Sequence, residues 1–205
     1  MKVIKFIVGA FKTNCYLAID EKLKIACLID PGSGYDKIRN YCDDNGLKLS
    51  CVLITHGHFD HVTEVGRWKM DGLPVYIHEL DASYLTLPKR LGYSPTKQMP
   101  QIVPDRLLKD GDEIAVGDFK LTVMHTPGHT EGSVCYIGDG VIFSGDTLFK
   151  GDYGRVDLPG GNFNDIKKSL KRLFSLPGNY VVNPGHDIPT DLDTERKTNI
   201  ILGEL

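Results

Sequence analysis

The hydrophobic residues of this chain occur in short runs separated by turns rich in glycine, proline and aspartate, and this pattern predicts strands with helices between them. In the N-terminal half the runs predict strands at residues 3–8, 15–19, 25–29, 50–54 and 75–77, with helices at 35–44, 63–70 and 78–85. In the C-terminal half they predict strands at 113–116, 120–125, 134–137, 141–143 and 180–182, with helices at 164–175 and from about residue 192. Strands interspersed with helices in both halves favour an α/β fold in which sheets pack together and helices cover their outer faces.

Residues 86–104 interrupt the regular pattern, because they contain four prolines and one glycine. Regular secondary structure is disfavoured there, so this segment is predicted to be either a flap or a surface excursion. Side chains in or beside it are candidates for substrate contacts, with a solvated loop as the alternative interpretation; they are Tyr84, Lys89, Arg90, Tyr93 and Lys97.

The composition is ordinary for a globular protein, with 41% hydrophobic and 25% charged residues among 205, and the length predicts a single domain over residues 1–205. A balance of 24 Lys+Arg against 27 Asp+Glu gives a net charge of -3, which argues against a nucleic-acid partner. No run reaches the roughly 20 apolar residues that a membrane helix needs. Five cysteines without a C-x-x-C pair predict buried free thiols in a reducing cytoplasm. The expected partner is therefore a small molecule.

A dense group of histidines directly follows the predicted strand 50–54. The segment 55–61 reads THGHFDH, so it contains His56, His58, Asp60 and His61. Seven histidines in 205 residues produce H-x-H-x-x-H by chance with odds below about one per cent. Ligand sites of α/β folds favour the carboxyl ends of strands, which is where this segment lies.

The same arrangement occurs three more times along the chain. An apolar strand leads through a short turn to His129, another leads to Asp146, and a third leads to His186. Four strand ends that carry imidazole and carboxylate groups predict one shared metal site at an edge of the sheets. Nitrogen and oxygen donors without a nearby thiolate suit Zn²⁺, Mn²⁺ or Fe. Seven donors are too many for one tetrahedral ion and fit two ions that share a carboxylate and a water.

Two histidines lie outside this pattern. His78 is predicted to have a structural role. His125 is predicted to be structural as well, with the alternative that it supports His129 as a neighbour of a metal ligand.

The segments around these donors resemble the metallo-β-lactamase superfamily. The resemblance rests on THGHFDH at 55–61, TPGHT at 126–130, SGDT at 144–147, PGH at 184–186, FKTNCYL at 11–17 and DPG at 30–32. It implies a four-layer α/β/β/α sandwich of the metallo-β-lactamase type. It also implies that His56, His58 and His129 hold one metal, that Asp60, His61 and His186 hold the other, and that Asp146 bridges the two. Asp60 would in addition be the catalytic residue that orients the bridging hydroxide and handles its proton.

Within the superfamily the chain resembles glyoxalase II-like hydrolases, which split hydroxyacyl thioesters. The β-lactamases of this fold lack an aspartate bridge at the Asp146 position, and the segment GDYGRVDLPGG at 151–161 resembles the glyoxalase II loop. By this resemblance Arg155 binds the substrate, where a guanidinium suits a carboxylate. The alternative is a salt bridge between Arg155 and Asp152 or Asp157 that shapes the loop. Glyoxalase II enzymes also carry a C-terminal helical domain, whereas only residues 192–205 are expected to serve here.

Three functions are therefore weighed. The first is a hydrolase with a dinuclear site, most simply with two zinc ions, that cleaves a small thioester or related acyl substrate. The second is a mononuclear iron oxygenase of the persulfide dioxygenase type, in which His56, His129 and Asp146 form a two-His, one-carboxylate triad. The third is hydrolysis of a lactone or another ester. A non-catalytic binding module that kept the fold is disfavoured, because all seven candidate ligands are intact.

Overall fold

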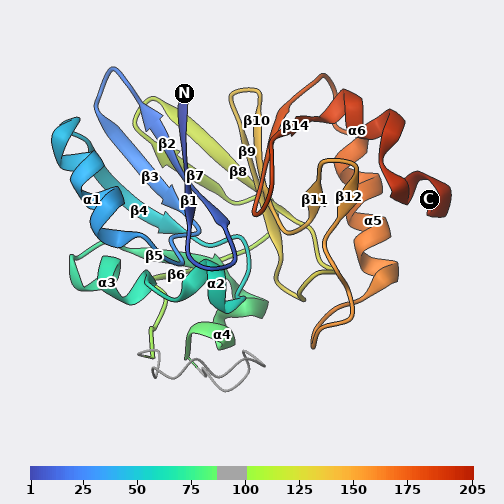
Figure 1. Cartoon of the computed structure of the whole chain (residues 1–205), viewed down its shortest axis with the longest axis horizontal. Coiled ribbons are helices and arrows are strands. Elements are labelled where there is room, and N and C mark those ends of the chain that lie inside the picture. Colours follow the sequence, from blue (N-terminus) through green and yellow to red (C-terminus); the bar gives the residue numbers. More distant parts are fainter. Residues whose placement is uncertain (87–100) are drawn as a thin grey trace.

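The computed structural model of the chain describes residues 1–86 and 101–205, and two six-stranded sheets form its centre (Figure 1). The first sheet has the order β1 (Lys2–Val8), β2 (Thr13–Asp20), β3 (Ile25–Ile29), β4 (Lys48–Leu53), β5 (Val75–His78) and β6 (Arg106–Leu108). The second has the order β14 (Thr190–Asp191), β13 (Val181–Pro184), β10 (Val141–Gly145), β9 (Val134–Gly138), β8 (Phe119–His125) and β7 (Glu113–Val116). A small hairpin of β11 (Leu148–Phe149) and β12 (Asp152–Tyr153) stands apart from both.

Strand β2 shows why the sheets pack in layers. Its side chains alternate between the two faces: Cys15 and Leu17 enter the outer core of the first sheet, while Tyr16 and Ala18 enter the core between the sheets. Every residue of β2 is buried. The first sheet is therefore covered on both faces at this strand.

Helices cover the outer faces of both sheets (Figure 1). Helices α1 (Tyr35–Asp44) and α3 (Val65–Met70) pack on the first sheet through Ile38 and Trp68. Helices α5 (Phe163–Phe174) and α6 (Leu192–Thr198) pack on the second through residues such as Leu170 and Leu192. The order helix, sheet, sheet, helix confirms the predicted four-layer sandwich of the metallo-β-lactamase type.

The carboxyl ends of the central strands meet at one edge of the sandwich. Strands β3, β4, β5 and β6 are parallel to one another, and β10 is parallel to β13. Strand β8 runs in the same direction as β10, because both are antiparallel to β9. The segments that follow β3, β4, β5, β8, β10 and β13 therefore begin along this edge.

Most predicted elements are confirmed, and the differences concern short ones. The predicted helix 63–70 is preceded by the one-turn helix α2 (Phe59–Val62), and the helix predicted at 78–85 divides into a 3-10 turn, Glu79–Asp81, and α4 (Ala82–Thr86). Strands β6, β11, β12 and β14 and the 3-10 helix Ile200–Glu204 were not predicted. Most of the predicted flap, residues 87–100 with Lys89, Arg90, Tyr93 and Lys97, lies outside the described residues.

The cysteine prediction is confirmed, since all five cysteines are free and buried. Within residues 1–86 and 101–205 no helix is long and apolar enough to cross a membrane.

Candidate metal centre

The seven predicted ligands come together at the shared edge of the two sheets. His56 and His58 follow β4, and Asp60 and His61 lie in α2 immediately afterwards. The remaining three, which follow β8, β10 and β13, are His129, Asp146 and His186. Their ligand atoms form three overlapping groups, in each of which the atoms lie within 4.8 Å of one another: His56, His58 and His129; His56, His61 and Asp146; and Asp60, His61 and His186.

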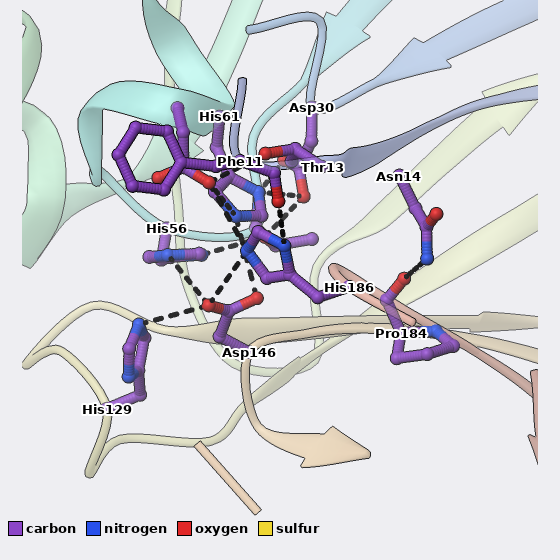
Figure 2. A network of polar contacts seen from close by, with 12 residues as sticks. Phe11, Thr13, Asn14, Asp30, His56, His61, His129, Asp146, Pro184 and His186 are labelled. Carbon is purple, nitrogen blue, oxygen red and sulfur yellow. Dashed lines mark hydrogen bonds and ion pairs between the residues drawn. The ribbon is translucent and has the colours of Figure 1, made fainter. Parts of the chain in front are cut away.

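Asp146 lies between the two sets of histidines, as Figure 2 shows. Its Oδ2 is 3.4 Å from Nε2 of His129 and 3.9 Å from Nε2 of His56. Its Oδ1 is 3.5 Å from Nε2 of His61. Its Oδ2 is also 3.6 Å from Nε2 of His186. One carboxylate thus lies within reach of histidines of both sets, which is the position that a bridging ligand needs.

On the other side of the centre, His186 and His61 face Asp60. The Oδ2 atom of Asp60 is 3.2 Å from Nε2 of His186 and 3.4 Å from Nε2 of His61. Asp60 and His186 are partly accessible, with 14% and 25% of their side chains exposed, and His58 is partly exposed as well, whereas His61 is fully buried. Ligands of both sets therefore reach the solvent.

The buried polar atoms of the centre fit metal ions. The Nε2 atoms of His56, His61 and His129 are buried and have no hydrogen-bond partner among the described residues, and the same is true of Oδ1 of Asp146. An unpaired buried polar atom carries a desolvation cost of about 1–3 kcal/mol. Such atoms turned toward one another from three segments are accounted for if they bind cations, since imidazole and carboxylate are suitable donors for Zn²⁺, Mn²⁺ and Fe.

The other nitrogen of three histidines is occupied by a hydrogen bond. Nδ1 of His61 lies 3.0 Å from Oδ2 of Asp30, and Nδ1 of His186 lies 3.2 Å from the carbonyl oxygen of Phe11. Nδ1 of His129 lies 2.8 Å from the carbonyl oxygen of Arg155. Each of these partners is an acceptor, so each Nδ1 donates its proton and each Nε2 is left free to bind a metal.

Asp30 also connects His61 with His56. Its carboxylate accepts from the backbone N–H of Thr55 at 2.8 Å and from the Thr55 hydroxyl at 2.6 Å, and this hydroxyl lies 3.1 Å from Nδ1 of His56. Asp30 follows β3 with a φ of 51°, a left-handed conformation that aspartate tolerates better than most residues. The turn DPG therefore supports the loop that carries His56 and His61.

The surroundings of the histidines give the His56 and His58 side of the centre a lower pKa than His61. Burial, together with the neighbouring imidazoles, lowers the pKa of His56 and brings that of His58 to about 4. Burial alone would also lower the pKa of His61, but the carboxylates of Asp146 and Asp30 outweigh it and raise the pKa to about 10. The negative charge of the centre is thus concentrated around His61, where a cation would replace the proton.

Asp60 is held ionised by its surroundings. Burial acts to raise its pKa, but the hydrogen bond with His186 and the charge of His61 hold the pKa well below the usual range. The hydroxyl of Thr13, at the start of β2, donates to Oδ2 of Asp60 at 2.7 Å. Thr13 was not singled out from the sequence.

Gly185 is required by the close packing of the site. A Cβ atom at this position would lie 2.2 Å from Oδ1 of Asp146 and 2.8 Å from Cε1 of His61. No side chain fits there without displacing the aspartate. Steric packing therefore explains why the PGH segment has a glycine before His186. The pattern of strands and strand ends in the sequence does not reveal this requirement.

Arg155 lies at the rim, and its side chain forms the salt bridge that was the alternative to substrate binding. Its Nε and Nη2 donate to the carboxylate of Asp157, both at 2.7 Å. The side chains of Arg155 and Asp157 are 62% and 65% exposed, so this contact is open to solvent. The backbone of Arg155 orients His129, so the residue is connected to the centre in any case.

The two remaining histidines are outside the centre. His78 and His125 stack with their ring centroids 4.1 Å apart. His125 contacts the carbonyl oxygen of Glu131 through Nε2, whereas Nδ1 of His129 is oriented by Arg155. The structural interpretation of both histidines fits these contacts, and the alternative of His125 as a support of His129 does not.

Comparison with known proteins identifies the family. The sequence profile described as Metallo-beta-lactamase superfamily matches residues 8–186. The chain belongs to this superfamily. It is 41% identical to an uncharacterised protein of Aquifex aeolicus (99% of this chain, 98% of that one) and 36% identical to the probable metallo-hydrolase YqgX of Bacillus subtilis (98% of both). It is 30% identical to the hydroxyacylglutathione hydrolase GloC of Haemophilus influenzae, over 95% of each chain.

Solved structures of the superfamily match over nearly the whole chain. BLEG-1 B3 metallo-beta-lactamase has a TM-score of 0.88 at 31% identity, over 98% of this chain and 99% of its own. TTHA1623 in a di-iron-bound form has a TM-score of 0.82 at 35% identity, over 97% and 99%. ETHE1 from Myxococcus xanthus has a TM-score of 0.85 at 29% identity, over 100% and 85%. TTHA1623 shows that a structure with this fold can hold two iron ions.

Proposed function

We propose that this protein is a dinuclear metal-dependent hydrolase, most simply a zinc enzyme, that cleaves a small thioester or a related acyl substrate. The observation that carries the proposal is the position of Asp146. Its carboxylate reaches histidines of both sets, His56 and His129 through Oδ2, His61 through Oδ1 and His186 through Oδ2. The Nε2 atoms of His56, His61 and His129 are buried without partners. His56, His58 and His129 would hold one ion, Asp60, His61 and His186 the other, and Asp146 both.

Two bound divalent ions supply an acidic shared water and a Lewis acid for the substrate carbonyl. The chain's residues divide the other tasks. In this proposal the substrate carbonyl enters where ligands of the centre are partly exposed, at Asp60, His186 and His58. Asp60 stays ionised and receives the Thr13 hydroxyl on Oδ2, so this carboxylate is placed to orient the attacking water and take its proton.

A thiolate leaving group suits this site. Thiols have pKa values near 8.5, so the departing sulfur needs little help from a proton donor. The similarity to the hydroxyacylglutathione hydrolase GloC supports this substrate class.

Arg155 is the substrate-binding residue of the proposal. Its guanidinium is exposed and is paired with Asp157 in the geometry that it would use for a substrate carboxylate. Asp157 would hold the guanidinium extended until the substrate carboxylate competes for it. We place this reaction in the cytoplasm, where a small thioester would be the partner.

The test is an assay of purified protein loaded separately with Zn²⁺, Mn²⁺ and Fe²⁺. The panel pairs each thioester with the oxygen ester and the lactone of the same acyl group, and adds a β-lactam. We expect the thioesters to be cleaved fastest, and Asp60→Asn to lose on the order of 100-fold or more of this activity. Cleavage of the β-lactam alone, or of no compound, would contradict the proposal.

The mononuclear iron oxygenase is the second candidate. One observation favours it: a single oxygen of Asp146, Oδ2, lies near both His56 and His129, as a two-His, one-carboxylate triad requires. The similarity to ETHE1 from Myxococcus xanthus is compatible with it. One iron per chain, together with oxygen consumption on persulfides and no thioester cleavage, would select this function.

A further inference from the structure

Asp81 is a buried carboxylate that no step of the proposed reaction uses. It is the last residue of the 3-10 turn Glu79–Asp81, which directly follows β5, and its exposed fraction is 0%. No cation pairs with it among the described residues. A fully buried carboxylate is costly unless its oxygens are well hydrogen-bonded, so its partners indicate what it does.

These partners belong to two metal-bearing loops. Oδ2 of Asp81 accepts from the backbone N–H of Gly57 at 2.7 Å and from the hydroxyl of Thr130 at 2.8 Å. Oδ1 accepts from the backbone N–H of Gly132 at 2.7 Å. Gly57 stands between His56 and His58, and Thr130 follows His129. One carboxylate thus joins the two loops that carry the three-histidine group.

The packing around this carboxylate leaves it little freedom. A Cβ atom at Gly132 would lie 2.6 Å from both the backbone nitrogen and Oδ1 of Asp81. The hydroxyl of Thr130 also lies 2.7 Å from the hydroxyl of Ser133, which accepts from the Thr130 N–H at 3.0 Å. The glycine permits the close approach, and the serine fixes the threonine that meets Asp81.

The other metal group is supported by different residues. Asp60 is fixed by Thr13, His61 by Asp30, and His186 by the carbonyl oxygen of Phe11. Asp81 touches none of these three ligands in the described contacts. Mutation can therefore affect one metal group at a time: Asp81 supports the His56, His58 and His129 group, and Thr13 supports the Asp60, His61 and His186 group.

We infer that Asp81 is a positioning residue that assembles the His56, His58 and His129 group, and that it sets the metal affinity of this group without setting that of the Asp60, His61 and His186 group. The inference rests on the proposed function in that it requires two ions. Residues that orient metal ligands from behind typically change metal affinity by about 10–100-fold when they are altered.

The experiment is a titration of metal-free protein with Co²⁺ against a competing chelator, followed by the absorption bands of the bound ion. His58→Ala and His186→Ala assign each binding step to its group. Asp81→Asn keeps the shape of the side chain but replaces one accepting oxygen with an NH₂ group that faces N–H or O–H donors. We expect the metal affinity of the binding step that His58→Ala removes to fall about 10–100-fold. The affinity of the other binding step should stay unchanged. Thr13→Val is the matched control for the other group. It should lower the metal affinity only of the binding step that His186→Ala removes.

Thr130→Val is the second variant. It removes one hydrogen bond to Asp81 and leaves the carboxylate in place, so a smaller loss at the same step is expected, and it decides the question if Asp81→Asn does not fold. Equal weakening of both steps, or a lowered melting temperature with unchanged affinities, would overturn the inference. Failure of the unmodified protein to bind a second ion would instead contradict the proposed function, so the two failures are distinguishable.

Discussion

The imidazole Nδ1 atoms of His61, His129 and His186 all face hydrogen-bond acceptors, and these acceptors come from segments far away in the sequence. At the scale of single residues, the metal centre therefore depends on atoms behind the ligands as much as on the ligands. Thr13 and Arg155 allow this dependence to be measured at two points of the site, one at the proton-handling carboxylate and one at the rim.

Thr13→Val tests the support of Asp60 in catalysis. The variant removes the hydroxyl that donates to Oδ2 of Asp60 and keeps the branched shape. We expect kcat to fall about tenfold or more, because the carboxylate loses its fixed orientation. Steady-state kinetics of the metal-loaded protein measures this, with Thr13→Ser as the control that keeps the hydroxyl. Equal losses in both variants would show that the shape of the side chain, and not the hydrogen bond, matters.

Arg155→Ala tests the rim contact. A hydrogen bond to a charged group contributes about 1.5–3 kcal/mol, so KM for a thioester that carries a carboxylate should rise about tenfold or more. The kcat and the KM of a neutral thioester should stay the same. In Asp157→Asn the guanidinium keeps its charge and loses its partner, so KM for the charged thioester should not rise. If Arg155→Ala changes both substrates equally, the salt bridge to Asp157 only shapes the loop.

The sequence predicted the gathering of the seven donors better than their supports. The metal donors lie directly after apolar strands at four places in the chain, and this recurring pattern can be recognised from the sequence. Thr13 and Asp81 are single polar residues whose partners are fixed only by tertiary contacts. Asp81 lies in the predicted helix 78–85, shortly after the predicted strand 75–77, and nothing in the local sequence distinguishes it from a solvent-facing acidic residue of a helix.

At the scale of elements, length decided what could be predicted. Helix α1 and strand β7 have the predicted bounds, because each has several residues in register with its pattern. Strands β11, β12 and β14 have two residues each, which is too short for an alternation to be recognised. Their pairing is set by tertiary contacts, so no local property of the sequence announces them.

Asn162 tests how one helix is fixed beside the site. Its side chain accepts from the N–H groups of Asn164 and Asp165 at the start of α5, and its backbone N–H donates to the carbonyl oxygen of Gly128, next to His129. Asn162→Ala removes the cap and should lower the free energy of unfolding by about 1 kcal/mol. Denaturant unfolding measures the change. Asn162→Asp keeps a capping oxygen, so an equal loss in this control would contradict the capping role.

At the scale of the whole molecule, the two sheets place the carboxyl ends of their central strands on one edge. This arrangement brings together segments as distant in sequence as Thr13 and His186. It explains why the sequence predicted where the metal ligands gather but not which residues support them. The four-layer order followed from strands with two buried faces, such as β2, which need a second sheet on one side and helices on the other.

The stability of the molecule toward acid provides a further test, through His78. Burial, together with the charge of His125, lowers the pKa of His78 from 6.5 to about 4. The unfolded chain therefore binds this proton between pH 6.5 and about 4 while the folded chain does not, so stability falls as the pH drops through this window. The loss from this residue is at most about 3 kcal/mol.

His78→Asn removes the titrating group and keeps an acceptor for the N–H of Leu80. Chemical unfolding at pH 7, 6, 5 and 4 should give a smaller decline in the free energy of unfolding for the variant than for the unmodified protein. Parallel declines in the two proteins would show that His78 takes up its proton equally well in the folded state.

The number of metal ions per chain tests the central claim most directly. Metal-free protein is equilibrated with Zn²⁺ by dialysis, and bound metal and protein are then measured by elemental analysis. The account predicts two ions per chain, and one in His186→Ala, because Asp146 remains with the three-histidine group. One ion per chain in the unmodified protein would contradict it, since seven donors that converge from both sheets would then serve a mononuclear centre.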